Sequence, residues 1–270
     1  MVSVGERDFC IEDGVLVRYY GHEQNVTIPN GVTKIEPEAF NSCETIASIT
    51  LPETATSIGK DAFADCVNLK SITIPNGVTE IGEEAFINCL SLRSVTIPDS
   101  VTEISRGTFA GCESLESAFI PVGVTTIEEG AFSDCDSLMS ITIPNGVTKI
   151  GEEAFMFCGS LKTINIPCSV TEIEPRTFGS CLSLESVHIP DGVTEIGKGA
   201  FNCCEALTSV EIPDSVTQIG PFAFANCRSL KSITLPEDVI VDKSAFYGCD
   251  SLEEVTYIGQ SHSEPVYEER

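Results

Sequence analysis

Residues 69–91 have the sequence LKSITIPNGVTEIGEEAFINCLS, and close copies of this 23-residue unit fill most of the chain. In the first third of each copy an apolar residue is followed by proline, as in Ile74-Pro75, and every interval between these pairs is 23 residues. Repetition at a fixed period of this length indicates a repeat protein, in which each unit forms one coil of a stack. The apolar members of the ten pairs are Ile28, Leu51, Ile74, Ile97, Ile120, Ile143, Ile166, Ile189, Ile212 and Leu235.

The first half of the unit has the two-residue period of a β-strand. Ile72 and Ile74 point to one side of an extended chain, and Ser71 and Thr73 point to the other. Pro75 ends the strand because proline has no N–H to donate to a neighbouring strand. We therefore expect each coil to contain one short strand with an apolar inner side and a hydroxyl-bearing outer side.

The second half of the unit predicts a turn, a second extended segment and a short helical turn. Asn76-Gly77 is a pair typical of turns, and residues 78–81 form the second extended segment. After Gly82, the sequence EEAF at residues 83–86 suits a helical turn with its two acids at the positively polarised end.

A single coil cannot bury its own apolar edge, but stacked coils can. With strands about 4.8 Å apart, the stack forms a continuous parallel sheet, so the fold class is a repeat solenoid. One phenylalanine occupies the same position in every coil, which predicts an internal column of stacked rings rather than a cofactor site. One residue is missing before the last member, so the last coil is irregular. The column consists of Phe40, Phe63, Phe86, Phe109, Phe132, Phe155, Phe178, Phe201, Phe224 and Phe246.

Ten of the thirteen cysteines also recur in register. A disulfide framework, a metal store and a column of buried thiols are the three interpretations. Stacked Cβ atoms about 4.8 Å apart with parallel bond vectors do not suit a disulfide, which needs converging vectors and about 3.8 Å. A line of ligands also cannot form a tetrahedral metal site, so we expect buried thiols and no bound metal or cofactor. The column consists of Cys43, Cys66, Cys89, Cys112, Cys135, Cys158, Cys181, Cys204, Cys227 and Cys249.

Three further cysteines, Cys10, Cys168 and Cys203, lie outside this register. Cys168 follows a proline in a turn, so we expect it to be the most reactive thiol of the chain.

The unit, with the strand L-x-x-I-x-I-P and the later A-F-x-x-C, resembles the BspA-like (Treponema-type) leucine-rich repeat over residues 25–258. The resemblance implies a curved, right-handed leucine-rich-repeat solenoid, with the parallel sheet on the concave face and short helical turns on the other. It also implies a binding role of the kind found in microbial surface proteins, and it supplies no catalytic residues.

Three segments are expected along the chain. Residues 1–24 include an alternating pattern around Asp13-Gly14, which predicts a β-hairpin with a type I′ turn that caps the first coil. Residues 25–258 form the solenoid, with a last strand over residues 255–258. Residues 259–270 form a polar C-terminal tail that we expect to be mobile.

The charge and composition exclude several kinds of partner. The formal net charge is −26, from 41 acidic and 15 basic residues, so phosphate backbones and anionic membrane surfaces would be repelled. No apolar run reaches the roughly 18 residues of a membrane-spanning helix. The start of the chain, MVSVGERDF, lacks the basic segment and apolar run of a secretory signal. We expect either that the protein stays where it is made or that this chain is part of a longer product, whereas the resemblance suggests a cell-surface or secreted protein.

Candidate site residues are those that depart from the serine and threonine columns on the outer side of the strands. Phe119 places an aromatic ring among hydroxyls, and exposed aromatic residues are common anchors at interfaces. Asn165, His188 and Glu211 stand on three consecutive strands, where they predict a polar patch. A flat solvated surface provides no pocket to shift the pKa values of a histidine and a glutamate, so we do not expect acid–base catalysis there.

These observations favour a non-catalytic binding or adhesion module for a protein or glycan ligand, with no nucleic-acid binding and no membrane insertion. A structural, self-associating repeat protein is the alternative. Ice binding through regular hydroxyl columns and an enzymatic role are the remaining, weaker hypotheses, and the chain carries no phosphate-binding loop or nucleophile motif.

Overall fold

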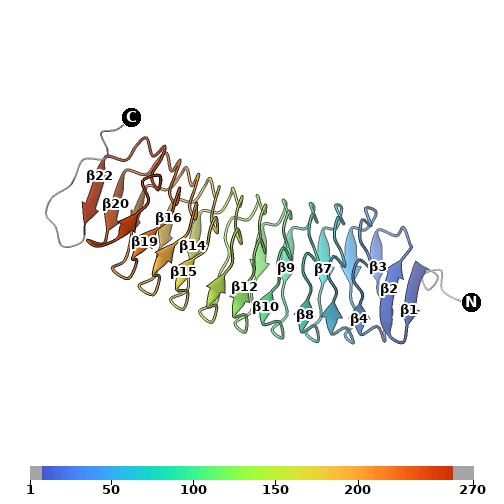
Figure 1. Cartoon of the computed structure of the whole chain (residues 1–270). Coiled ribbons are helices and arrows are strands. Elements are labelled where there is room, and N and C mark those ends of the chain that lie inside the picture. The colour runs from blue at the N-terminus through green and yellow to red at the C-terminus, as the bar shows by residue number, and fades with distance from the viewer. Residues whose placement is uncertain (1–7, 258–270) are drawn as a thin grey trace, which may run out of the picture.

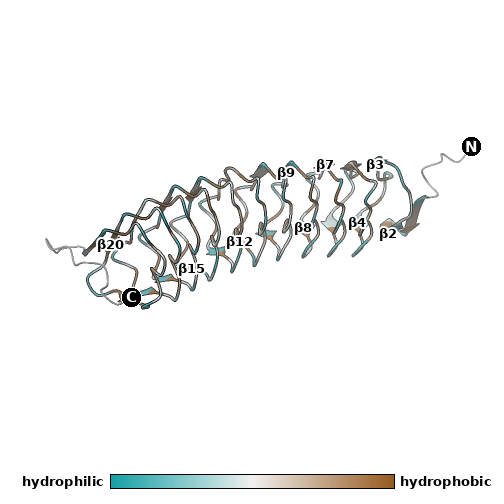
Figure 2. Ribbon diagram, turned by 90° about the horizontal axis from the view of Figure 1, so that it is seen from above, coloured by the Kyte–Doolittle hydropathy of each residue, from teal (hydrophilic) through white to brown (hydrophobic). Residues whose placement is uncertain are grey.

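The computed structural model describes residues 8–257, in which successive coils stack along one axis into a solenoid of mostly parallel strands (Figure 1). Two rows of strands run along the stack on different sides of it, with β3, β7, β9 and β20 in one row and β4, β8, β12 and β15 in the other (Figure 2). The repeat solenoid expected from the sequence is therefore confirmed.

The first row contains the strand that precedes each proline. In β9 the expected alternation is present, because Val95 is buried while Ser94 and Thr96 are exposed. The coil that contains residues 140–142 has the same sequence pattern but no strand at this place. The row consists of β3 (Asn25–Thr27), β5 (Ser48–Thr50), β7 (Ser71–Thr73), β9 (Ser94–Thr96), β11 (Ser117–Phe119), β14 (Thr163–Asn165), β16 (Ser186–His188), β18 (Ser209–Glu211), β20 (Ser232–Leu235) and β22 (Glu254–Tyr257).

The second row contains the extended segment expected after the Asn-Gly turn, although each strand covers only its last two residues. In every strand of this row except the last, the second residue is a buried isoleucine and the residue before it is at the surface, as in Glu80 and Ile81. In the last strand Ile240 is exposed and Val241 is half-buried. The strands are β4 (Lys34–Ile35), β6 (Ser57–Ile58), β8 (Glu80–Ile81), β10 (Glu103–Ile104), β12 (Thr126–Ile127), β13 (Lys149–Ile150), β15 (Glu172–Ile173), β17 (Glu195–Ile196), β19 (Gln218–Ile219) and β21 (Ile240–Val241).

The expected continuous sheet is interrupted. The first row is divided into four groups, β3-β5-β7, β9-β11, β14-β16 and β18-β20-β22, and the second row is divided between β8 and β10 and between β13 and β15. Each strand of the two rows is only two to four residues long, and many of the backbone hydrogen bonds between coils lie outside the strands, as from Phe86 to Thr108. The stack is therefore held together by hydrogen bonds between turns as well as by sheet pairing.

The short helical turns expected after Gly82 are not present, and the described residues contain no α-helix. Instead, backbone N–H groups alternate between two kinds of acceptor. Ala85 donates to the carbonyl of Gly82 in its own coil (3.3 Å), whereas Phe86 donates to Thr108 in the next coil (2.9 Å). Glu84 and Asn88 have φ angles of 54° and 57°, in the left-handed region. A helix is excluded because every second N–H is turned toward the neighbouring coil.

The phenylalanine column is confirmed as an internal spine. Nine of its ten rings are at most 1% exposed, and neighbouring centroids lie 5.0–5.8 Å apart. Tyr19 and Phe9 continue the column at the N-terminal end, with centroids 5.1 Å from Phe40 and from Tyr19 respectively. Sequence analysis missed these two rings because they precede the regular 23-residue spacing.

A hairpin lies at the N-terminal end of the stack. β1 (Phe9–Glu12) and β2 (Val15–Tyr19) are antiparallel, and β2 pairs in parallel with β4. Asp13 and Gly14 have φ angles of 49° and 80°, as a type I′ turn requires. Residues 259–270, expected as a polar tail, and Ile258, expected in the last strand, lie outside the described residues.

Candidate functional site

The outer side of the first-row strands, called here the hydroxyl face, is made by the first and third residue of each strand. Because parallel strands pair in register, Ser48 lies opposite Ser71 and Thr50 lies opposite Thr73. Small neutral side chains therefore form columns across coils, and a larger or charged residue in a column changes the surface locally.

Phe119 is the largest departure from these columns. It ends β11 opposite Thr96 of β9, and 56% of its surface is exposed. Its coil breaks two further columns. Ala118 stands where the neighbouring coils have Val95 and Ile141, and Val122, which is 84% exposed, stands where most coils have asparagine or an acid.

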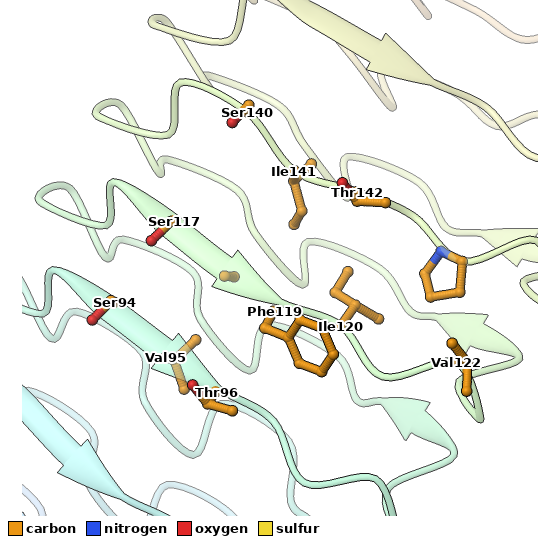
Figure 3. A pocket seen from close by; sticks show the side chains of 12 residues that line it. Ser94, Val95, Thr96, Ser117, Phe119, Ile120, Val122, Ser140, Ile141 and Thr142 are labelled. Carbon is orange, nitrogen blue, oxygen red and sulfur yellow. The ribbon is translucent and has the colours of Figure 1, made fainter.

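These departures surround a hollow of about 480 Å³ between β9, β11 and residues 140–144 (Figure 3). The short Ala118 side chain leaves space between Val95 and Ile141, and the Phe119 ring stands beside that space. The polar side chains that line the hollow are serines and threonines, and none of the twelve lining residues is charged. Sequence analysis selected Phe119 but missed Ala118 and Val122, although both break their own columns and could have been found in that way.

The hollow lies where the sheet ladder opens. Within the described chain, no backbone hydrogen bond joins residues 116–120 to residues 139–143, although β9 and β11 are fully paired on the other side. The same coils stay in contact elsewhere, because Thr126 pairs with Lys149 in the second row and the Phe109 and Phe132 rings are 5.3 Å apart. The opening is therefore local to the hydroxyl face, and backbone polar groups at the hollow lack their usual partner in the next coil.

The three polar candidates lie further along the same face. Asn165 of β14 and His188 of β16 are directly opposite each other. Glu211 stands on β18 and pairs with Thr234 of β20. Among the described residues no ion pair joins His188 to Glu211. The structure thus brings Asn165 and His188 together, places Glu211 on the next coil, and separates all three from Phe119 by the coil that contains Thr142.

The cysteine column is buried, as expected from the sequence. Its eight inner members are buried, and only the end members Cys43 and Cys249 are half-exposed. Each thiol from Cys66 onward donates a hydrogen bond to the carbonyl of the spine phenylalanine in the preceding coil, at 3.0–3.3 Å. Burial raises the pKa of Cys66, Cys112 and Cys181 to about 12, so these thiols are protonated near neutral pH and are poor nucleophiles.

The three cysteines outside the register differ from the column. Cys168 is exposed, and Cys10 and Cys203 are half-buried. All thirteen thiols are free, and residues 8–257 contain no group of three or more histidine, cysteine or acidic side chains placed to hold a metal ion. In the same residues there is no helix with the length and hydropathy needed to cross a membrane.

Solved structures of bacterial leucine-rich repeat proteins are similar to this chain. A leucine-rich repeat protein from Eubacterium ventriosum is 25% identical, with a TM-score of 0.57, over 91% of this chain and 81% of that one. A leucine-rich repeat protein from T. pallidum is 27% identical, with a TM-score of 0.51, over 72% of this chain and 82% of that one. A leucine-rich cell surface protein from Faecalibacterium prausnitzii is 28% identical over 92% of this chain and 91% of that one, with a TM-score of 0.48. No curated protein matches the sequence.

A family model described as "BspA type Leucine rich repeat region (6 copies)" matches residues 19–138, 56–185 and 171–264. These overlapping matches cover most of the chain and contain both rows of strands, the ten phenylalanines of the spine and the cysteine column. The chain therefore belongs to the BspA-type leucine-rich repeat family.

Proposed function

We propose that this chain is a non-catalytic binding module whose hydroxyl face holds a protein or glycan partner, with Phe119 as the central anchor. The observation that carries the proposal is that three departures from the repeat pattern, Ala118, Phe119 and Val122, fall in one coil and line the same hollow. An exposed aromatic ring beside an apolar hollow can contribute a large part of the binding free energy, because such anchors dominate most interfaces.

Asn165, His188 and Glu211 extend the proposed surface toward the C-terminal half. They form a polar region beside the apolar anchor, which is the usual arrangement of an interface with an apolar centre and a polar rim. The chemistry of the thiols supports a binding role rather than catalysis, because the column that recurs in every coil is used to hold coils together.

The experiment compares the intact chain with Phe119→Thr on protein and glycan arrays. Threonine is the residue of the flanking coils, Thr96 and Thr142, so this change removes the ring without introducing a foreign residue into the column. We expect at least a tenfold loss of signal for the specific partner, since an anchor of this kind contributes about 2 kcal/mol or more.

Phe157→Ser is the matched control. Phe157 is also an exposed phenylalanine, but it lies in the turn after the spine, where equivalent coils carry Ser42 and Ser180 at the same positive φ. The control should bind as the intact chain does. Equal binding by the intact chain and Phe119→Thr would contradict the proposed role of the hydroxyl face around Phe119.

A further inference from the structure

We propose that the hollow beside Phe119 is a site for a neutral sugar ring, with one face of a pyranose stacked on the Phe119 ring. This inference rests on the proposed binding function and names the class of ligand that the hollow takes. It is carried by four properties of the hollow: its charge, its hydrogen-bonding groups, its aromatic wall and its size.

The absence of charge in the lining favours a neutral ligand. The chain as a whole has a net charge of −26, yet the twelve residues around the hollow include no acid and no base. A charged group moved from water into such a place would lose hydration without gaining a counter-charge. A phosphate, a carboxylate or an ammonium group is therefore a poor occupant, and a sugar with hydroxyl groups alone has no such cost.

The polar groups of the hollow match those of a sugar. Ser94, Ser117, Ser140, Thr96 and Thr142 line it, and a hydroxyl both donates and accepts hydrogen bonds, as each sugar hydroxyl does. The open ladder adds backbone groups of residues 116–120 and 139–143 that have no backbone partner across the gap. Backbone groups without a partner in the neighbouring coil can bond to a ligand that supplies both donors and acceptors.

Phe119 supplies the surface on which a ring can stack. The face of an aromatic ring is the negative part of its quadrupole, so it attracts the slightly positive C–H groups on the apolar side of a pyranose. Figure 3 shows the Phe119 ring on the coil that lies between those of Thr96 and Thr142. The hollow, at about 480 Å³, falls within the range of small-molecule sites, which is about 300–1,000 Å³.

The test uses ligand-observed saturation-transfer NMR and titration calorimetry on the purified chain. The probes are the methyl glycosides of glucose, galactose, mannose and N-acetylglucosamine, with sodium glucuronate as the anionic comparison. We expect weak binding of at least one neutral glycoside, with saturation transferred mainly to the C–H groups of one ring face, and at least tenfold weaker binding of glucuronate.

Two variants locate the site. Phe119→Thr removes the stacking surface. Ala118→Ile leaves Phe119 in place and fills the space beside Ala118 with an isoleucine side chain, as Ile72 and Ile141 do at the same position. Both should weaken sugar binding at least tenfold, and Phe157→Ser should leave it unchanged. Urea unfolding of each variant checks that the fold is retained.

Three results would overturn the inference: no binding of any neutral glycoside, binding that survives in both hollow variants, or binding of glucuronate as tight as that of glucose. A protein partner whose binding requires Phe119, in a chain that binds no sugar, would leave the proposed binding function standing and remove only the sugar site.

Discussion

The thiol of Cys89 donates a hydrogen bond to the backbone carbonyl of Phe63 in the preceding coil, with an Sγ–O distance of 3.3 Å. Both residues are fully buried. The same bond recurs from coil to coil, for example from Cys135 to Phe109. It joins the two recurring core columns, so each cysteine fixes its coil against the spine residue of the coil before it.

Replacement of Cys89 by alanine should therefore destabilise the protein. The change removes a buried sulfur and the donor to the Phe63 carbonyl, for an expected loss of about 1–3 kcal/mol in the free energy of unfolding. Urea unfolding measures this loss. Cys168→Ala is the control, because Cys168 is exposed and its change should stay within about 0.5 kcal/mol. Equal stability of Cys89→Ala and the native chain would show that the thiol bond contributes nothing.

Thiol labelling under native conditions should modify Cys168 first. Cys168 is the one cysteine that is exposed rather than buried or half-buried, whereas the inner column thiols are buried and their pKa values are raised by burial. Mass spectrometry of the peptides after a short exposure to iodoacetamide gives the order of reaction. Inner members of the column, such as Cys89 and Cys135, labelled as fast as Cys168 would contradict the buried column.

Alkaline pH should weaken the fold through the same thiols. Burial raises the pKa of Cys112 and Cys181 from 9.0 to about 12. A raised pKa means that the folded chain keeps its proton while the unfolded chain loses it. The stabilisation is thus complete below about pH 9 and is lost as the pH rises toward 12, by about 1.4 kcal/mol per pH unit for each such thiol.

Urea midpoints measured between about pH 8 and pH 10 test this slope. Cys112→Ala should show a shallower decline than the native chain, because one of the titrating thiols is absent. Identical slopes for the two proteins would assign the alkaline loss to other groups.

Gly130 should stabilise the left-handed conformation of its turn. Its φ of 60° lies in the left-handed region, which costs a residue with a Cβ about 1 kcal/mol. We expect Gly130→Ala to lower the free energy of unfolding by about that amount. Gly146→Ala in the next coil is the control, since Gly146 has no positive φ and an added Cβ would only reach ordinary contact with the Val122 carbonyl at 3.4 Å. A larger loss for Gly146→Ala would contradict the assignment.

The polar candidates should affect binding without affecting the fold. His188→Thr and Glu211→Thr restore the threonine that β5, β7 and β9 carry at this place, so stability should change by less than about 0.5 kcal/mol. If these residues form the rim of the proposed surface, each variant should weaken partner binding, but less than Phe119→Thr does. Array binding and urea unfolding measured on the same preparations decide this. Unchanged binding in both variants would confine the surface to the coils near Phe119.

The sequence alone determined the solenoid, the phenylalanine spine and the buried cysteine column, because a constant 23-residue period places equivalent residues in one column whatever the details of each coil. It also placed Phe119 on the outer side of its strand, through the two-residue period of an extended chain.

Only the tertiary structure decided how the rest of each coil is bonded. The segment around Glu84 and Asn88 has the composition of a helical turn, but every second backbone N–H donates to a carbonyl of the neighbouring coil. The sequence of one repeat unit cannot predict these bonds, because their acceptors belong to another unit. Other coils carry glycine at the positions of Glu84 and Asn88, as at Gly130 and Gly111. These glycines were the sign in the sequence that the backbone is left-handed there.

The opening of the ladder between β11 and residues 140–142 is also decided by contacts between coils. The sequence SIT at residues 140–142 is identical to that of β5 and β7, so its failure to form a strand follows from its neighbours and not from its own residues. Pairing between strands depends on the distance between two coils, and that distance is set by how all the core columns pack at once.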